Sequence, residues 1–360
     1  MAEPLFDETS PSPAQLAAAY GANAARSLKA LELETAPPAE VGSAPKELLY
    51  ERGTLRLYHF LPQTDEVYRV PLLMVMATTN RGYLFDLMPG QSMMDVLVQA
   101  GFDVYMMDWA APLPEERGLT LDDYTQDFIP TCIRKVQEHS GEEEVSLAGY
   151  CQGGVLSLIY AATHPDGPVK NLALFAVPYN QHGMKLARVW SDERFMDIDR
   201  MVDTYGVIPA SVITRFFDML RPAQRTASKL RLWAMNDSDD YVASHRVMER
   251  WGDEMLPLPG AYYRDCTKKL MWGNELFTGE LVSGGVRADI ANIKVPCLHA
   301  IAQHDHIVPF ESSQPLIERI GSEDKEEVVL KGGHVSLIAG PRAARRMWPK
   351  LVDWLSERSY

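Results

Sequence analysis

The segment GYCQGG at residues 149–154 constrains this chain more than any other. Residues 145–148 are typical of a short buried strand and residues 155–162 of a helix, so the segment occupies a tight turn between them. A strand, a sharp turn and a helix together present a nucleophile at the tip of the turn, here the thiol of Cys151. Gly149 and Gly153 suit such a turn, because its strained backbone leaves no room for side chains on either flank. The alternative is a small buried cysteine in the glycine-rich turn of a nucleotide-binding fold.

Composition and charge exclude several classes of protein. The net charge of −14 and the lack of a Lys and Arg cluster argue against nucleic acid binding, which depends on clustered positive charge. The longest apolar run, residues 72–77, is far shorter than the ~20 residues needed to cross a bilayer, and the acidic N-terminus lacks the pattern of a signal peptide. We therefore expect a cytoplasmic protein.

Neither a cofactor nor a metal is indicated. The four cysteines are widely spaced, without a CxxC pair, so the sequence predicts neither a disulfide framework nor a zinc site. The phosphate-binding patterns GxxxxGK[ST] and GxGxxG are absent as well. We expect no cofactor and no metal.

Buried strands and amphipathic helices alternate along most of the chain. This repetition predicts a mostly parallel sheet with helices on both faces. The strands are expected at residues 55–60, 71–76, 104–107, 145–148, 172–177, 297–302 and 328–330. The helices are expected at residues 86–100, 121–139, 155–163, 312–320 and 342–356.

Two stretches depart from this alternation. Residues 1–45 are rich in Ala, Pro, Ser and Glu and predict a mobile N-terminal arm with one short helix near residues 14–33. Residues 179–289 are helical and aromatic, which predicts a cap domain over the carboxyl ends of the strands, where α/β sheets bind ligands. The α/β core then comprises residues 46–178 and 290–360.

The elements of a catalytic triad follow the cysteine along the chain. A catalytic thiol needs a base, the base usually needs an acid to orient it, and the α/β-hydrolase fold places them in the order nucleophile, acid, histidine. Asp305 follows one predicted strand and His334 follows the next. This order predicts an α/β-hydrolase fold with Cys151, Asp305 and His334 as catalytic residues. The expected oxyanion donors are the backbone N–H groups of Gln152 and Thr79.

Other residues could contribute to this chemistry. His304 and His306 flank Asp305, so the three could form a metal site instead. The acidic cluster at residues 237–240 offers rival acids, although its sequence is typical of a turn. Asp305 itself could either orient the histidine or activate a substrate hydroxyl, because a thiol is acidic enough to ionise beside a histidine alone.

Further motifs lie along the chain. They are Gly149-x-Cys151-Gln152-Gly153-Gly154, Asp108-Trp109-x-x-Pro112, Asn80-Arg81-x-Tyr83-x-x-Asp86, Gly206-x-Ile208-Pro209, Leu220-Arg221-Pro222, Asp305-His306-Ile307-Val308-Pro309 and Gly333-His334. Together they resemble polyhydroxyalkanoate synthases from about residue 45 to the C-terminus. The length is similar to that of the short catalytic subunits of classes III and IV. Departures at Arg81-Gly82 and Phe310 leave the subclass and the acyl length open.

The resemblance implies polymerisation of (R)-3-hydroxyacyl-CoA into a polyester with release of CoA, in the cytoplasm on polyester granules. It implies that Cys151 carries the acyl chain, that His334 is its base and that Asp305 acts on the substrate hydroxyl. A homodimer and a separate helical partner subunit are expected as well. Further substrate contacts are expected from Asn80, Arg81 and His306.

Two other functions stay open. A cysteine-dependent thioesterase or intracellular polyester depolymerase would share the fold and the triad but let water reach the acyl-enzyme. A catalytically silent granule-binding protein would keep the fold alone.

Overall fold

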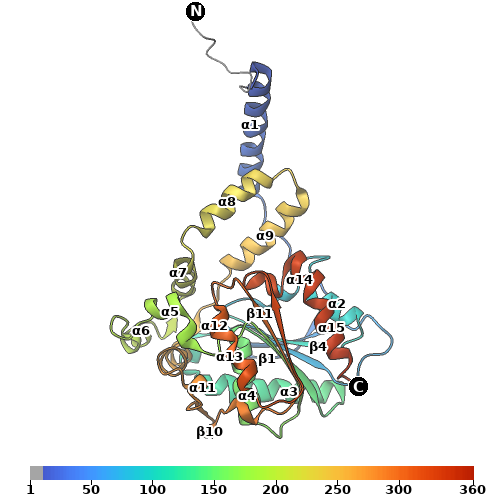
Figure 1. Cartoon of the computed structure of the whole chain (residues 1–360), viewed down its shortest axis with the longest axis vertical. Coiled ribbons are helices and arrows are strands. Elements are labelled where there is room, and N and C mark those ends of the chain that lie inside the picture. Colours follow the sequence, from blue (N-terminus) through green and yellow to red (C-terminus); the bar gives the residue numbers. More distant parts are fainter. Residues whose placement is uncertain (1–10) are drawn as a thin grey trace, which may run out of the picture. The chain divides into compact units, whose positions relative to one another are not determined.

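The computed structural model describes residues 11–360 (Figure 1). The chain divides into two compact units. One consists of Met1–Ala39, described from residue 11 onward, together with Arg221–Arg250, and the other of Glu40–Leu220 and Trp251–Tyr360. No helix in the described part of the chain is long and apolar enough to cross a membrane.

The larger unit is built on an eight-stranded sheet with the order β1-β2-β4-β3-β5-β6-β11-β12. The first three strands pair antiparallel and the other pairs are parallel, which confirms the predicted mostly parallel sheet. The strands are β1 (Lys46–Arg52), β2 (Leu55–Phe60), β3 (Leu72–Val75), β4 (Val104–Trp109), β5 (Val145–Tyr150), β6 (Val169–Phe175), β11 (Cys297–Ala302) and β12 (Lys325–Leu330).

Helices cover both faces of this sheet. Figure 1 shows α2 (Met93–Gln99), α14 (Gly340–Arg346) and α15 (Trp348–Ser356) grouped on one side. On the other side lie α3 (Ile129–Ser140) and α4 (Gln152–Thr163). Eleven of the twelve residues of α4 are buried, as expected for a helix enclosed between the sheet and its neighbours.

Most predicted elements are present, and the differences have local causes. The helix predicted at residues 86–100 begins only at Met93, because Pro89 and Gly90 form a turn in which Gly90 has a φ of 75°. The helix predicted at residues 312–320 is two short ones, α12 (Phe310–Ser313) and α13 (Pro315–Arg319), with Pro315 opening the second. Strand β1 was missed, since its charged residues alternate poorly with its apolar ones.

Residues 179–289, the predicted cap, are divided between the two units. Residues 179–220 and 251–289 belong with the sheet, whereas Arg221–Arg250 belongs to the smaller unit. The cap boundaries therefore stay a prediction. The elements within the larger unit are α5 (Lys185–Trp190), α6 (Ile198–Tyr205), β7 (Val207–Ile208), α7 (Ala210–Leu220), β8 (Leu258–Pro259), α10 (Gly260–Asp265), a π-helical turn (Cys266–Trp272), α11 (Glu275–Thr278), β9 (Val282–Ser283) and β10 (Val286–Arg287).

The smaller unit is helical. The helix expected near residues 14–33 is α1 (Pro13–Thr35), which Ser12 caps at its N-terminus. It is accompanied by α8 (Gln224–Met235) and by the first part of α9 (Asp239–Asp253). Two ion pairs connect α1 to these helices: Arg26 with Asp237, between α8 and α9, at 2.9 Å, and Lys29 with Asp239, the first residue of α9, at 3.1 Å. The first ten residues of the predicted N-terminal arm lie outside the described part.

Candidate active site

Cys151 lies at the turn between β5 and α4, as the sequence predicts. Its φ of 53° and ψ of −120° are strained for a residue with a side chain, as expected of a nucleophile at such a turn. The flanking glycines permit the close packing. A Cβ on Gly149 would lie 2.6 Å from Gly154 Cα, and a Cβ on Gly153 would overlap the carbonyl oxygen of Val75.

His334 and Asp305 meet in the structure although 29 residues separate them. His334 Nδ1 lies 2.7 Å from Asp305 Oδ2, and the two side chains are only 5% and 1% exposed. The other carboxylate oxygen, Oδ1, accepts hydrogen bonds from the backbone N–H groups of Ile307 at 2.8 Å and Val308 at 2.9 Å. Because a carboxylate can only accept, Nδ1 of the imidazole carries the proton, which leaves Nε2 as the basic atom.

The electrostatic surroundings favour a protonated His334. Burial opposes the charged form and by itself lowers the pKa of His334. The negative charges of Asp305 and of an ionised Cys151, and hydrogen bonds to both, act in the opposite direction and outweigh burial, so the pKa of His334 is raised. An imidazole in this position is therefore suited to hold a proton taken from a thiol.

Cys151 opens onto an apolar cavity of about 180 Å³. Thr78, Thr79 and Gln152 line it beside the cysteine, so both predicted oxyanion donors border the same space as the thiol. None of the described residues that line the cavity carries a charge, which suits an apolar acyl group and not the phosphates of CoA. Its apolar wall includes Met184, Ile213, Phe216, Phe217, Ile307 and Val308.

The loop that contains Thr79 is fixed from two directions. The Thr79 carbonyl accepts a hydrogen bond from the backbone N–H of Leu256 at 2.8 Å. The Gly82 N–H donates to Asp108 Oδ1 at 2.8 Å, and the indole N–H of Trp251 donates to the Arg81 carbonyl at 3.0 Å. The Asp108 motif thus holds the loop that supplies the second expected oxyanion donor.

The three predicted substrate contacts do not line the cavity. Asn80 is buried, and its Nδ2 donates to the Met255 sulfur at 3.0 Å. Arg81 donates to the Trp109 carbonyl at 3.2 Å. His306 is partly buried, next to the residues at 307 and 308 that do line the cavity. A role in substrate binding stays a prediction for all three.

A polar network around Gln152 was missed by the sequence analysis. Gln152 Nε2 donates to the sulfur of Cys266 at 3.4 Å, and the hydroxyl of Tyr262 lies 3.2 Å from that of Thr78. All four residues line the cavity. These residues are more than 100 positions apart in the chain, so no local sequence pattern could have predicted their contacts.

The remaining cysteines and the rival acids differ from the catalytic candidates. Burial raises the pKa of the Cys266 and Cys297 thiols to about 12 and that of Cys132 further still, so these thiols stay protonated. The acidic residues Asp237 and Asp239 pair with Arg26 and Lys29 in the smaller unit. Asp305 therefore stays the best candidate for the acid beside the histidine.

Two solved structures with a similar fold are lipases. The chain matches a putative lipase from Sulfolobus solfataricus with a TM-score of 0.57 at 15% identity, over 88% of this chain and 99% of that one. It matches a monoacylglycerol lipase from Paleococcus ferrophilus with a TM-score of 0.50 at 17% identity, over 85% of this chain and 99% of the other. At these identities the likeness concerns the fold alone.

Closer relatives are found among curated sequences. The chain is 33% identical over 329 residues to the poly(3-hydroxyalkanoate) polymerase subunit PhaC of Haloferax mediterranei, covering 91% of this chain and 66% of that protein. It is 34% identical over 323 residues to the protein of the same name from Allochromatium vinosum, covering 89% of this chain and 90% of the relative. A third such protein, from Synechocystis sp., is 33% identical over 326 residues, covering 89% and 86%.

A family profile described as the alpha/beta hydrolase fold matches residues 85–341, which include all three predicted catalytic residues. With relatives above 30% identity that are matched over nearly their whole length, the chain belongs to the poly(3-hydroxyalkanoate) polymerase subunit PhaC family within the α/β-hydrolase fold.

Proposed function

We propose that this chain polymerises (R)-3-hydroxyacyl-CoA into a polyester and releases CoA, through a thioester on Cys151. The observation that supports this most is the position of Cys151: the thiol stands at a strained turn, beside a buried His334–Asp305 pair, and opens onto an uncharged apolar cavity. The names of the relatives agree with this activity.

The first step would acylate the cysteine. His334 Nε2 accepts the thiol proton, and the thiolate attacks the thioester carbonyl of the substrate. The N–H groups of Gln152 and Thr79 would bind the developing oxyanion, since both residues border the cavity beside the thiol. The CoA thiolate leaves with the proton held by His334, and the acyl group stays on Cys151.

The second step would extend the chain. The 3-hydroxyl group of another substrate attacks the acyl thioester on Cys151, and a base accepts the hydroxyl proton. The Cys151 thiolate leaves and takes that proton back, and the extended chain, now a CoA thioester, acylates Cys151 again with release of CoA. The resemblance assigns this task to Asp305, but the geometry favours His334. Both oxygens of Asp305 already accept hydrogen bonds, its side chain is 1% exposed, and it does not line the cavity. In this proposal His334 serves both steps and Asp305 orients it.

The choice of sulfur suits such a cycle. A thioester on Cys151 is close in energy to the incoming CoA thioester, so it remains reactive toward an alcohol. An acyl group that fills the apolar cavity would displace water from the thioester and so disfavour hydrolysis of the acyl-enzyme.

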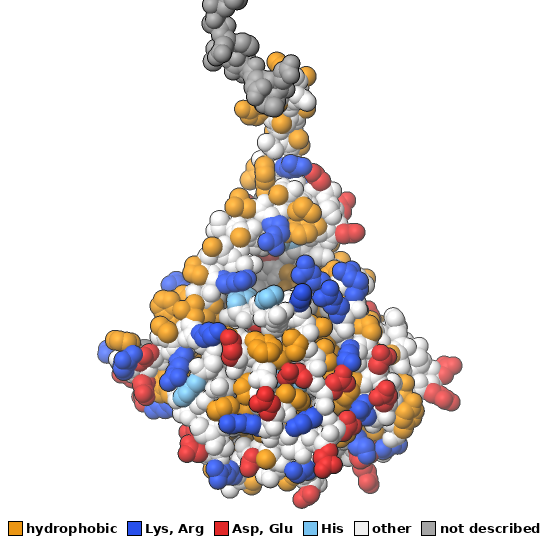
Figure 2. All heavy atoms as spheres, in the orientation of Figure 1, with side chains coloured by type: hydrophobic (Ala, Val, Ile, Leu, Met, Phe, Trp, Pro, Cys, Tyr) orange, Lys and Arg blue, Asp and Glu red, His pale blue; other side chains and the backbone are white. Residues whose placement is uncertain are grey.

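We further propose that a separate helical subunit packs against the smaller unit, and that the enzyme acts as a homodimer on polyester granules. Figure 2 shows apolar side chains exposed along the helices of this unit. Neither α1 nor α8 has a buried residue. The exposed fractions are 75% for Tyr20, 63% for Leu28, 60% for Leu31 and 63% for Leu230. Apolar faces of this kind are typical of protein interfaces.

The function is tested with the full chain and (R)-3-hydroxybutyryl-CoA. The decrease in thioester absorbance measures substrate consumption, and the products are then separated into insoluble polymer and free hydroxyacid. We expect polymer, with no thioester loss in Cys151→Ala and unchanged products in a Cys297→Ala control. Free hydroxyacid as the main product would indicate a thioesterase or depolymerase instead. No turnover, alone or with the cognate partner subunit, would contradict the proposal.

A further inference from the structure

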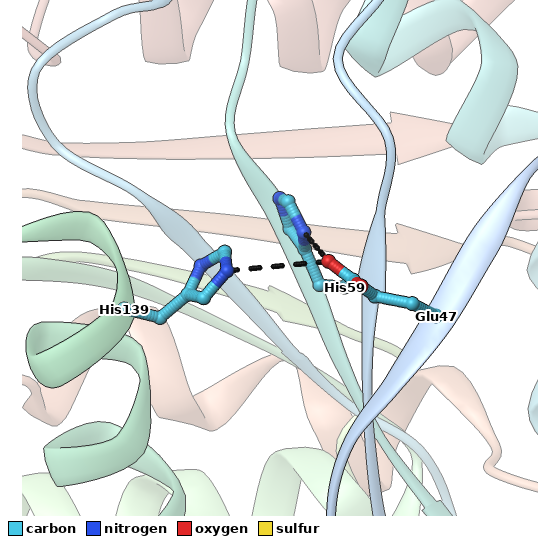
Figure 3. A group of neighbouring side chains, drawn as sticks. All are labelled: Glu47, His59 and His139. Carbon is cyan, nitrogen blue, oxygen red and sulfur yellow. Dashed lines mark hydrogen bonds and ion pairs between the residues drawn. The ribbon is translucent and has the colours of Figure 1, made fainter.

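Three ionisable side chains far from Cys151 converge at the edge of the sheet formed by β1 and β2. Glu47 lies on β1, His59 on β2 and His139 in the last turn of α3 (Figure 3). Glu47 Oε1 is 3.1 Å from His59 Nδ1 and 4.0 Å from His139 Nε2. One ligand atom from each of the three lies within 4.8 Å of the others. Spacings of 12 and 80 residues gave no signal of this in the sequence.

The hydrogen bonds that His59 and His139 form on the side away from Glu47 determine which ring nitrogens are basic. His59 Nε2 lies 2.9 Å from Asp103 Oδ1, and a carboxylate can only accept, so Nε2 donates. The hydroxyl of Tyr105 donates to Asp103 Oδ2 at 2.8 Å. His139 Nδ1, which is 2.7 Å from that hydroxyl, must therefore donate to it. In the neutral rings the lone pairs are on His59 Nδ1 and His139 Nε2.

These two lone pairs face the carboxylate of Glu47, as the dashed lines in Figure 3 indicate. Three acceptors thus share one space and repel one another unless a positive charge lies between them. A proton on His59 Nδ1 would satisfy its contact with Glu47, and the exposed His139 Nε2 would then be left to solvent. A divalent cation would satisfy all three atoms.

The charge of the surroundings favours a cation. Asp103 is buried and Glu47 is exposed, and among the residues that the structure describes neither carboxylate has an ion pair with Lys or Arg.

We propose that Glu47, His59 and His139 form a zinc site, with Glu47 Oε1, His59 Nδ1 and His139 Nε2 as ligands. The donor set of two imidazoles and one carboxylate is one that Zn²⁺ prefers. The ligand atoms of a tetrahedral zinc ion lie about 3.3 Å apart. His139 Nε2 must therefore move about 1 Å closer to the other two ligand atoms when the ion binds. Glu47 and His139 are both exposed, which lets them move and gives an ion access from solvent.

Asp103 and Tyr105 complete the arrangement as partners of the ligands. The hydrogen bond from His59 to the Asp103 carboxylate fixes the ring with Nδ1 toward the site. Tyr105 does the same for His139 and also stacks on the His59 ring, with centroids 4.7 Å apart. The structure thus orients both imidazoles without help from an ion.

The position of the site indicates a structural role. Asp103 directly precedes β4, whereas Cys151 directly follows β5, and both strands run parallel to β3. The two sites therefore lie at opposite ends of the sheet. A zinc ion there would connect β1, β2 and α3. This proposal goes beyond the proposed function, because polymerisation does not require the ion.

The test is zinc binding by the full chain without an affinity tag, after dialysis against a chelator. Titration calorimetry with zinc chloride is done on the wild type and in a Cys151→Ala background, which removes the thiol as a competing ligand. We expect one zinc ion per chain in both. His139→Ala and Glu47→Gln, which change exposed ligands, should each weaken binding at least about tenfold. The matched controls His182→Ala and Glu138→Gln should not.

Two further readouts separate this site from others. Zinc should raise the unfolding temperature of the wild type and leave that of His139→Ala unchanged. Bound cobalt should give the visible bands of a tetrahedral site without a thiolate band in the near ultraviolet. The proposal is overturned by an absence of saturable binding, by equal affinity in the ligand variants, or by binding that disappears in Cys151→Ala. In the first case a protonated His59 accounts for the cluster.

Discussion

Replacing Asp305 with asparagine should invert the tautomer of His334. The new side-chain amide would keep its oxygen toward the backbone N–H groups of Ile307 and Val308, from which Asp305 Oδ1 now accepts at 2.8 and 2.9 Å. The amide nitrogen would then face His334 Nδ1, where the carboxylate now lies at 2.7 Å. Because an amide nitrogen only donates, Nδ1 must accept and the proton moves to Nε2. The imidazole could no longer take the proton of Cys151.

The size of the effect follows from the lost interactions. In a serine protease triad the corresponding exchange lowers kcat about 10⁴-fold, and general base catalysis contributes about 10²- to 10⁴-fold. Asp305→Asn should slow acylation within this range. Asp305→Ala leaves either tautomer accessible and removes one hydrogen bond to a charged group, worth about 1.5–3 kcal/mol. That corresponds to about a 10- to 150-fold loss, so alanine should be the milder change.

The assay is rapid-quench measurement of the first CoA released, followed by the steady-state rate. Wild type should release a burst that is near-stoichiometric with Cys151. His334→Gln should show no burst, Asp305→Asn a greatly slowed one, and Asp305→Ala an intermediate one. Circular dichroism and the unfolding temperature check that each variant is folded.

Two results would refute this reasoning. If both Asp305 variants keep the full burst and lose only sustained turnover, then Asp305 acts on the substrate hydroxyl, as the resemblance to polyester synthases implied. If the burst of Asp305→Ala is as slow as that of Asp305→Asn, the tautomer argument fails.

Two other predictions concern the thiols and the turn. Iodoacetamide at pH 8 should modify Cys151 first, because a pKa of about 12 leaves only about one Cys266 thiol in ten thousand ionised. The modified residues are identified by peptide mass spectrometry, and equally fast modification of Cys266 would contradict the prediction. Gly153→Ala should lower the free energy of unfolding by about 3 kcal/mol or more, because the new Cβ overlaps backbone that cannot move aside. The control is Gly118→Ala, whose Cβ meets no atom within 4 Å, and equal urea midpoints for the two variants would argue against the packing explanation.

The sequence was sufficient for seven of the eight strands of the sheet and for the order of the triad. Strands β2 and β11 have the predicted bounds, because buried strands produce a clear apolar pattern. The turn at Cys151 was visible because its glycines serve a local purpose. The contact between His334 and Asp305 followed from chain order within the fold, without any knowledge of distances.

Features that depend on contacts between distant segments could not be predicted. The network of Gln152 with Cys266 and the cluster of Glu47, His59 and His139 form only when strands and helices are packed. The motif residues Asn80 and Arg81 predicted substrate contacts, which stay a prediction; the contacts of their side chains with Met255 and the Trp109 carbonyl could not be predicted. A motif thus identifies residues that matter without saying what they touch.

The loop at residues 305–308 performs two tasks within four residues. Its first residue holds His334, its backbone N–H groups fix that carboxylate, and its side chains at Ile307 and Val308 form part of the cavity wall. An insertion or a change of backbone here would therefore alter the acid–base chemistry together with the shape of the cavity. Ile213, Phe216 and Phe217 come from α7, and their side chains take no part in the hydrogen bonds that hold Asp305 and His334. Variation in acyl preference, natural or engineered, should accordingly accumulate on that side while the loop stays constant.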